Sequence, residues 1–198
     1  SKNESENINR VNPSRDKLSS LLEHYQQGRF GDAEKLAKTI SREYPSHNLS
    51  WKILGSVLRT TGRASEAIHA HQKAVALSPQ DAEAHTNLGN TLKVLGRLAE
   101  SVASHEKAIA LQPEFAIAYN NLGNTLKNLG RLDEAKVSYT QAIKLKPNFA
   151  DAMTNLSNAL SYMNNLEAEI ASLKSILQIN DENHALRAGV NLAICYFL

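Results

Sequence analysis

The stretch YNNLGNTLKNLGRLDEAKVSYTQAIKLKPN, from Tyr119 to Asn148, predicts the fold because shifted copies of it fill most of the chain. Successive copies lie 34 residues apart. The shared positions include a glycine (Gly28, Gly62, Gly96 and Gly130) and a proline (Pro45, Pro79, Pro113 and Pro147). Self-similarity at a fixed period of this size indicates a repeat architecture, in which each unit buries its apolar face against its neighbours.

One unit, residues 116–149, reads as two helices joined by a glycine turn. The first helix is predicted from about Ile117 to Leu129, with apolar residues at helical spacing: Ala118, Tyr119, Leu122, Leu126 and Leu129. Gly130 ends it, because glycine accepts the left-handed conformation common after a helix. The second helix is predicted from Leu132 to Leu145, with apolar residues Ala135, Val137, Tyr139, Ala142, Ile143 and Leu145. Pro147 then blocks its continuation.

Small residues recur at fixed places in both helices. Glycine is found in the first helix at Gly55, Gly89 and Gly123, and a small residue in the second at Ala33, Ala67, Ser101 and Ala135. Glycine inside a helix costs up to about 1 kcal/mol relative to alanine, so its repetition predicts a packing requirement. We expect the small residues to let the two helices approach closely.

The combined pattern resembles the tetratricopeptide repeat (TPR) family. It reads Tyr119, Leu122, Gly123, Leu126, Ala135, Tyr139, Ala142 and Pro147 in the most regular unit. The resemblance implies an all-α solenoid, a right-handed superhelix of antiparallel helix pairs whose first helices line a concave groove. It leaves the function open, since one fold serves many activities.

The period divides the chain into a polar tail and five full repeats. We predict a tail at residues 1–13 and repeats at 14–47, 48–81, 82–115, 116–149 and 150–183. A partial sixth repeat, one extra helix, occupies 184–198. Its apolar end near Leu198 would make a poor solvent-facing cap. The natural protein is therefore expected to continue, and the alternative is a homodimer contact through this end.

Composition excludes several classes of partner. The formal net charge of the 198 residues is +2, too small to predict binding to nucleic acid or an anionic membrane. No apolar run is long enough for a transmembrane helix. The single cysteine, Cys195, excludes an internal disulfide and favours a reducing compartment, so a cytoplasmic location is expected. No catalytic or phosphate-binding motif is found, so we expect neither enzymatic activity nor a cofactor.

The candidate site is an array of asparagines on the first helices. Asn87, Asn121 and Asn155 share one repeat position, and Asn90, Asn124 and Asn158 lie about one turn later. A carboxamide both donates and accepts, so a row of them could bind a peptide backbone in the groove. Arg59, Lys93 and Lys127 follow and would favour an acidic, extended segment. The alternative is that these asparagines reflect the repeat pattern alone.

Two finer resemblances concern particular groove residues. Asn87 and Asn121 in their Leu-Gly-Asn contexts, with Asn155 before Leu-Ser-Asn, resemble the TPR arm of O-linked N-acetylglucosaminyltransferases. The resemblance implies substrate recognition for a catalytic domain absent from this chain. The carboxylate clamp of co-chaperone TPR domains is matched by Lys52 and Asn87, but Ser56 stands where that clamp has asparagine. We therefore expect no such clamp, and include Lys52 only as a groove cation.

Three histidines stand at repeat positions usually held by aromatic residues. His71 and His105 share one position, and His85 takes the position of Trp51. A metal site is conceivable because imidazole is a common ligand. Substitution for an aromatic ring is the favoured interpretation, so no metal is predicted.

The preferred function is a scaffold that binds protein or peptide segments. The alternatives are the recognition arm of a larger, glycosyltransferase-like enzyme and a scaffold that associates with itself.

Overall fold

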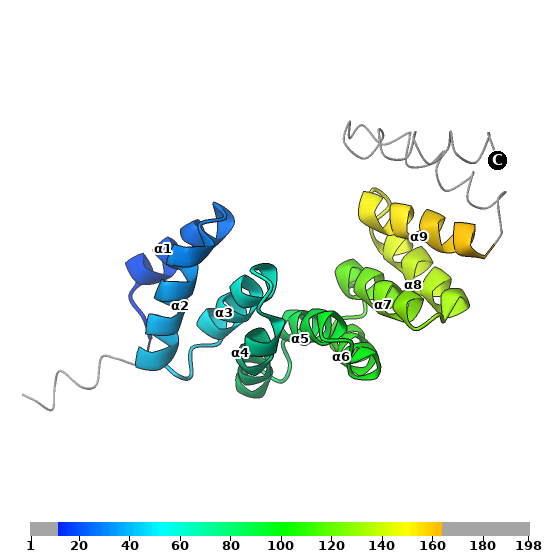
Figure 1. Ribbon diagram of the computed structural model, residues 1–198. Helices are drawn as coiled ribbons and strands as arrows, with labels where there is room; N and C mark the ends of the chain where they lie inside the picture. The colour runs from blue at the N-terminus through cyan, green and yellow to red at the C-terminus, as the bar shows by residue number, and fades with distance from the viewer. Residues whose placement is uncertain (1–11, 164–198) are drawn as a thin grey trace, which may run out of the picture. The chain divides into compact units, whose positions relative to one another are not determined.

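The computed structural model describes residues 12–163, and within this range the chain is an all-α solenoid of helix pairs (Figure 1). The helices are α1 (Arg15–Gln26), α2 (Phe30–Glu43), α3 (Asn48–Thr60), α4 (Ala64–Leu77), α5 (Ala82–Val94), α6 (Leu98–Leu111), α7 (Ala116–Asn128), α8 (Leu132–Leu145) and α9 (Ala150–Tyr162). Odd-numbered helices are the first helices of the repeats, and even-numbered helices are the second. The described part contains no strand.

Glycine turns end the first helices as the sequence predicted. Gly28, Gly62, Gly96 and Gly130 have φ values of 70°, 81°, 73° and 75°. Residues other than glycine rarely adopt this left-handed backbone conformation, which explains why a glycine recurs at this repeat position. The bounds of α8 match the predicted range, whereas α7 begins and ends one residue earlier than predicted.

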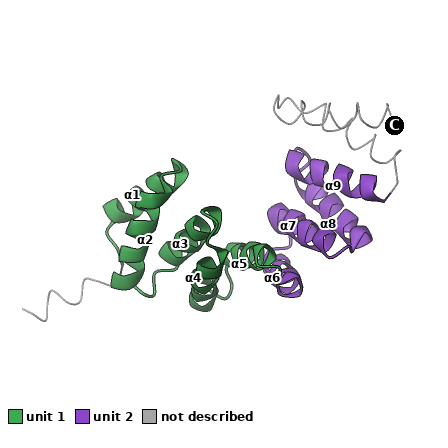
Figure 2. Cartoon of the chain, viewed as in Figure 1, with its two compact units in different colours: residues 1–96 green, residues 97–198 purple. Residues whose placement is uncertain are grey.

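The chain forms two compact units, Ser1–Gly96 and Arg97–Leu198 (Figure 2). The division falls in the turn between α5 and α6, inside the third predicted repeat. Unit 1 therefore contains α1 to α5, and unit 2 contains α6 to α9.

The core of unit 1 gathers the apolar faces of its first four helices. Its buried side chains include Leu21, Ile40, Ile53, Leu54, Val57 and Leu58. Leu21, which stands where other repeats have a small residue, is fully buried. Trp51 packs at the edge of this core, donates from Nε1 to the Pro45 carbonyl at 2.9 Å, and meets the His69 ring edge-on. The tryptophan is therefore a packing residue.

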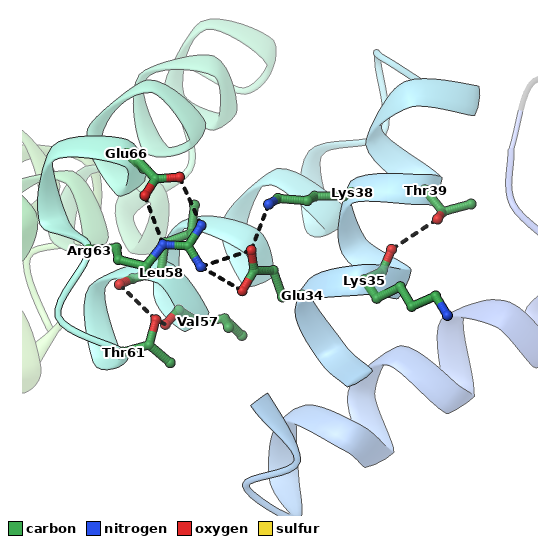
Figure 3. Close-up of polar contacts among 9 residues, drawn as sticks. All are labelled: Glu34, Lys35, Lys38, Thr39, Val57, Leu58, Thr61, Arg63 and Glu66. Carbon is green, nitrogen blue, oxygen red and sulfur yellow. Dashed lines mark hydrogen bonds and ion pairs between the residues drawn. The ribbon is translucent and has the colours of Figure 1, made fainter. Parts of the chain in front are cut away.

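An ion-pair network joins α4 to α2 in unit 1 (Figure 3). Arg63 Nη1 donates to both carboxylate oxygens of Glu34, at 3.0 and 2.9 Å, while Arg63 Nε donates to Glu66 at 2.8 Å. Lys38 also contacts Glu34, at 2.6 Å. The hydrogen bond from Lys38, with that from Arg63, lowers the pKa of Glu34 against the opposing effect of burial. Arg63 thereby links two repeats, while the equivalent Arg97 and Arg131 pair with glutamates of the helices that follow them.

The core of unit 2 centres on Tyr139, which is fully buried among Val102, Leu122, Leu126, Ala135 and Ala159. The prediction that Val137 belongs to the apolar face of its helix is wrong, because its side chain is 68% exposed. The same repeat position is exposed at Lys35, His69 and Ala103. A valine at this position therefore lies outside the core of unit 2.

Several sequence predictions lie outside the described residues. These are most of the polar tail, the second helix of repeat five, the partial sixth repeat and the contact near Leu198.

Candidate functional site

A ring from the second helix lies against a glycine of the first helix in both units. A Cβ built on Gly123 would lie 2.5 Å from Cε1 of Tyr139, and one on Gly55 would lie 1.8 Å from Cδ2 of His71. These distances are far below van der Waals contact, so alanine cannot be accommodated without movement of the ring or backbone. The glycines confirm the predicted packing requirement. What they accommodate, however, is a ring four residues after the small residue of the second helix.

In unit 2 the buried tyrosine reaches one of the predicted site residues. Tyr139 Oη donates to Asn124 Oδ1 at 2.9 Å, and burial raises the pKa of the phenol well above its ordinary value. The phenol therefore stays protonated and is a constant donor. Its hydrogen bond orients the Asn124 carboxamide, which is partly exposed on the first-helix face.

A second hydrogen bond joins the first helices of repeats four and five. Asn155 Nδ2 donates to Asn120 Oδ1 at 2.9 Å, and Asn120 is only 6% exposed. The bond brings α7 and α9 side by side through predicted site residue Asn155. Asn120 was not among the predicted site residues. The available signal was its position, which holds Leu18, Lys52, Thr86 and Thr154 in the other repeats and asparagine only here.

The remaining asparagines are partly exposed, and threonine hydroxyls bond to the backbone carbonyls of two of them. Thr125 Oγ1 donates to the Asn121 carbonyl at 3.0 Å, and Thr91 Oγ1 donates to the Asn87 carbonyl at 3.1 Å. Within residues 12–163, the structure assigns no hydrogen bond to the side-chain amides of Asn87, Asn90, Asn121 and Asn158. Of the six asparagines, Asn124 and Asn155 therefore have structural partners, and the other four present amide groups at the surface.

The stripes that carry these amides in unit 2 also expose large apolar side chains. On α7, Ile117 is 47% exposed and lies one helical turn before Asn121. On α9, Tyr162 is 73% exposed and lies one turn after Asn158. Residues three and four apart share a helix face, so each stripe combines one large exposed apolar side chain with two amides.

Lys52 and Arg59, two predicted groove cations of unit 1, differ in the contacts that they make within the chain. Lys52 pairs with Asp81 Oδ2 at 3.1 Å and also with Glu83, and its side chain is only 13% exposed. Burial disfavours its charge, but the hydrogen bonds to Glu83 and Asp81 outweigh burial and raise its pKa. Arg59 differs, because its Nε is buried without an acceptor among the described residues. In unit 2, Lys127 follows Asn124 on α7 and is partly exposed.

The histidines act as ring substitutes in unit 1. His71 is fully buried, and its Nδ1 lies 2.9 Å from the Asn87 carbonyl and 3.0 Å from Thr91 Oγ1. Burial lowers its pKa to about 4, so the ring is neutral at pH 7 and Nδ1–H donates to the carbonyl. His85 Nε2 lies 3.0 Å from the Pro79 carbonyl, which repeats the bond of Trp51 to Pro45. In the described part, no group of three His, Cys, Asp or Glu side chains could hold a metal ion.

None of the helices in residues 12–163 combines the length and apolarity needed to cross a bilayer.

The paired helices, turn glycines and glycine–ring contacts define a helical repeat protein. Tetratricopeptide repeat models match residues 21–82, 72–103 and 116–149, and a TPR repeat model matches residues 89–130. The chain belongs to the tetratricopeptide repeat family. The comparison with curated proteins gives no match.

Solved structures share the fold at low identity. PilW, a widely conserved type IV pilus biogenesis factor, is 21% identical with a TM-score of 0.80, over 91% of this chain and 84% of PilW. A thermophilic TPR protein of Thermus thermophilus is 20% identical with a TM-score of 0.77, over 93% and 99% of the two chains. YrrB, a TPR protein with an unusual peptide-binding site, is 20% identical with a TM-score of 0.66, over 94% and 96%. At these identities the similarity establishes the fold alone.

Proposed function

We propose that this protein is a non-catalytic interaction scaffold that binds an extended protein or peptide segment along its first helices. The observation that carries the proposal is the joined surface of α7 and α9 in unit 2. The Asn155–Asn120 hydrogen bond places these helices side by side, and their stripes combine amides with the exposed Ile117 and Tyr162. Amides suit a peptide backbone and apolar groups suit its side chains, which is the division of roles expected for peptide recognition.

Contacts within the chain separate stronger from weaker candidates among the residues that we propose to contact the ligand. Asn121 and Asn158 are the best candidates in unit 2, with Asn124 held in position by Tyr139. In unit 1, Asn87, Asn90 and Arg59 remain candidates. Lys52 is a weaker one, since a ligand would have to displace two carboxylates from its ammonium group. Lys93 and Lys127 support the proposed preference for acidic segments by charge. YrrB, with its peptide-binding site, offers a precedent on this fold.

The test is a selection of peptides from a random phage-displayed library against the full chain. Affinity of the selected peptides would be measured by fluorescence anisotropy for the wild type, the double variant Asn121→Ala/Asn158→Ala, and Thr140→Ala on α8 as a control. Each hydrogen bond contributes about 1 kcal/mol net, so losing two should weaken binding about thirtyfold. Thr140→Ala should leave affinity unchanged. Peptides that bind the double variant as tightly as the wild type would show that these amides are not the binding site.

Charge preference can be read from the same peptides. If the cations attract an acidic segment, selected sequences should be enriched in Asp and Glu, and their affinity should fall with added salt. Enrichment in Lys and Arg would contradict this part of the proposal. The interpretation as a recognition arm of a larger enzyme rests on sequence resemblance alone and remains a hypothesis.

A further inference from the structure

The outer stripe of α8 carries an exposed apolar side chain between two hollows. Val137, 68% exposed, lines both of them. One hollow, about 430 Å³, also contains Tyr119, Lys136, Thr140 and Gln141. The other, about 300 Å³, has Leu122 and Leu126 at its floor and Glu106, Asp133 and Glu134 at its rim. The valine therefore forms a ridge with an apolar recess on each side.

No other described second helix has a large apolar residue at this position. The equivalents of Val137 are Lys35 in α2, His69 in α4 and Ala103 in α6, and all three are exposed. The core of unit 2 does not use Val137, so intramolecular packing gives no reason for a valine there. An apolar side chain that projects beside apolar recesses is typical of a protein–protein contact.

Charge along this stripe changes sign from one end of α8 to the other. Asp133 and Glu134 lie in the first turn, Val137 and Thr140 follow, and Lys144 lies in the last turn. Asp133, Val137, Thr140 and Lys144 are spaced by three or four, so they share one face of the helix. Asp133 and Lys144 lie about 16 Å apart along the axis. A partner of one charge sign would match only one end, whereas a second α8 running antiparallel would match both.

We propose that the outer stripe of α8 is a self-association surface, on which a second copy of this chain packs α8 against α8 in antiparallel orientation. A two-fold axis near Val137 and Gln141 brings Lys144 of each copy to Asp133 of the other. It also seats each Val137 against the recesses beside its counterpart. Such an isologous contact is self-complementary, as two-fold symmetry requires. The surface is separate from the first-helix face, so the inference does not depend on peptide binding.

The contact is small, so the dimer is weak. A single helix of this length presents about 21 Å of contact, which corresponds to the lower end of specific interface sizes. The experiment is sedimentation equilibrium on the full chain from about 10 µM to about 1 mM, the range that so small an interface calls for. A concentration-dependent dimer is expected. A monomer over the whole range would overturn the proposal.

Substitutions distinguish α8 from other contact surfaces. Val137→Glu should raise the dimer dissociation constant at least about tenfold, because it places charge at the centre of the contact. Ala103→Glu, at the equivalent exposed position of α6, is the matched control and should leave dimerisation unchanged. Both positions are exposed, so helicity should be retained, which circular dichroism checks. A dimer that resists Val137→Glu would belong to another surface, such as the C-terminal end, and would overturn the proposal.

Charge reversal tests the antiparallel orientation. Lys144→Glu places acid opposite Asp133 in a homodimer, and Asp133→Lys places base opposite Lys144, so each variant alone should dimerise more weakly than wild type. An equimolar mixture of these variants has opposite charges at both ends of the contact. Mixing should therefore restore association to within about threefold of wild type. Failure of the mixture to associate better than either variant alone would exclude the antiparallel packing and overturn the proposal.

Discussion

The two units solve the same packing problem with different rings. In unit 1, His71 lies against Gly55 and bonds forward to the Asn87 carbonyl of the next repeat. In unit 2, Tyr139 lies against Gly123 and bonds to the Asn124 side chain of its own repeat. One ring anchors backbone between repeats, and the other orients a surface amide within a repeat. The rings at this shared repeat position therefore pack in the same way against a glycine, but their polar atoms form different hydrogen bonds.

The largest expected effect comes from filling the space under each ring. Gly55→Ala should lower the free energy of unfolding by about 3 kcal/mol, since its Cβ would collide with the His71 ring. Gly123→Ala should cost about 2 kcal/mol, because the collision with Tyr139 is less severe. Urea denaturation measures both, followed for unit 1 by the fluorescence of Trp51, the only tryptophan.

The matched control is Gly62→Ala, which meets no atom within 4 Å but has a φ of 81°. Its cost should be about 1 kcal/mol, from backbone strain alone. Were Gly55→Ala no more destabilising than Gly62→Ala, the ring would not be the reason for the glycine in the first helix.

The second effect is a pH dependence that arises from the buried His71 ring of unit 1. His71 has a pKa of about 4 in the folded protein and an ordinary value of 6.5. The unfolded chain therefore binds more protons between these values, and stability falls as pH drops through this window. The full loss approaches about 3 kcal/mol. Stability from urea denaturation between pH 4 and 7 should show this slope in the Trp51 signal.

The control for the pH effect is His71→Phe, which keeps a ring against Gly55 but cannot titrate. Its stability should change less steeply with pH than that of the wild type over the same window. Tyr139, whose pKa is raised by burial, remains protonated throughout this range and adds no slope. Equal slopes for wild type and His71→Phe would assign the pH dependence to other groups.

The smallest effect concerns the polar atom of the unit 2 ring. Tyr139→Phe removes the hydrogen bond to Asn124 and should cost about 1 kcal/mol, because the amide is partly exposed and can bond to water instead. A double-mutant cycle with Asn124→Ala isolates the pair, with hydrogen exchange of α7 and α8 as the local measure. A coupling energy near zero would mean that the tyrosine does not orient the amide.

The fold could be predicted from the sequence because the sequence repeats. The period located the turn glycines, the second helix of repeat four and the packing requirement at the first-helix glycines, because each repeat solves the same local problem. It did not predict the ring that meets each glycine, since the pattern indicated the small residue four positions earlier. Val137 was misassigned because it lies at the edge of the apolar stripe, where periodicity alone cannot separate the core from the outer face. Asn120 was overlooked because its repeat position has no common residue type.

The sequence by itself determined the family, the helix pairs and their turns, because these depend on the local conformational preferences of successive residues. A left-handed turn needs glycine and a helix end tolerates proline, whatever surrounds them. Tertiary structure alone decided which polar groups have partners. The side chains of Asn124 and Asn155 form hydrogen bonds, whereas Asn121 presents its amide at the surface. The ammonium group of Lys52 forms ion pairs with two carboxylates. These outcomes depend on distances between helices of different repeats or between the two helices of one repeat, which a pattern along one chain does not contain.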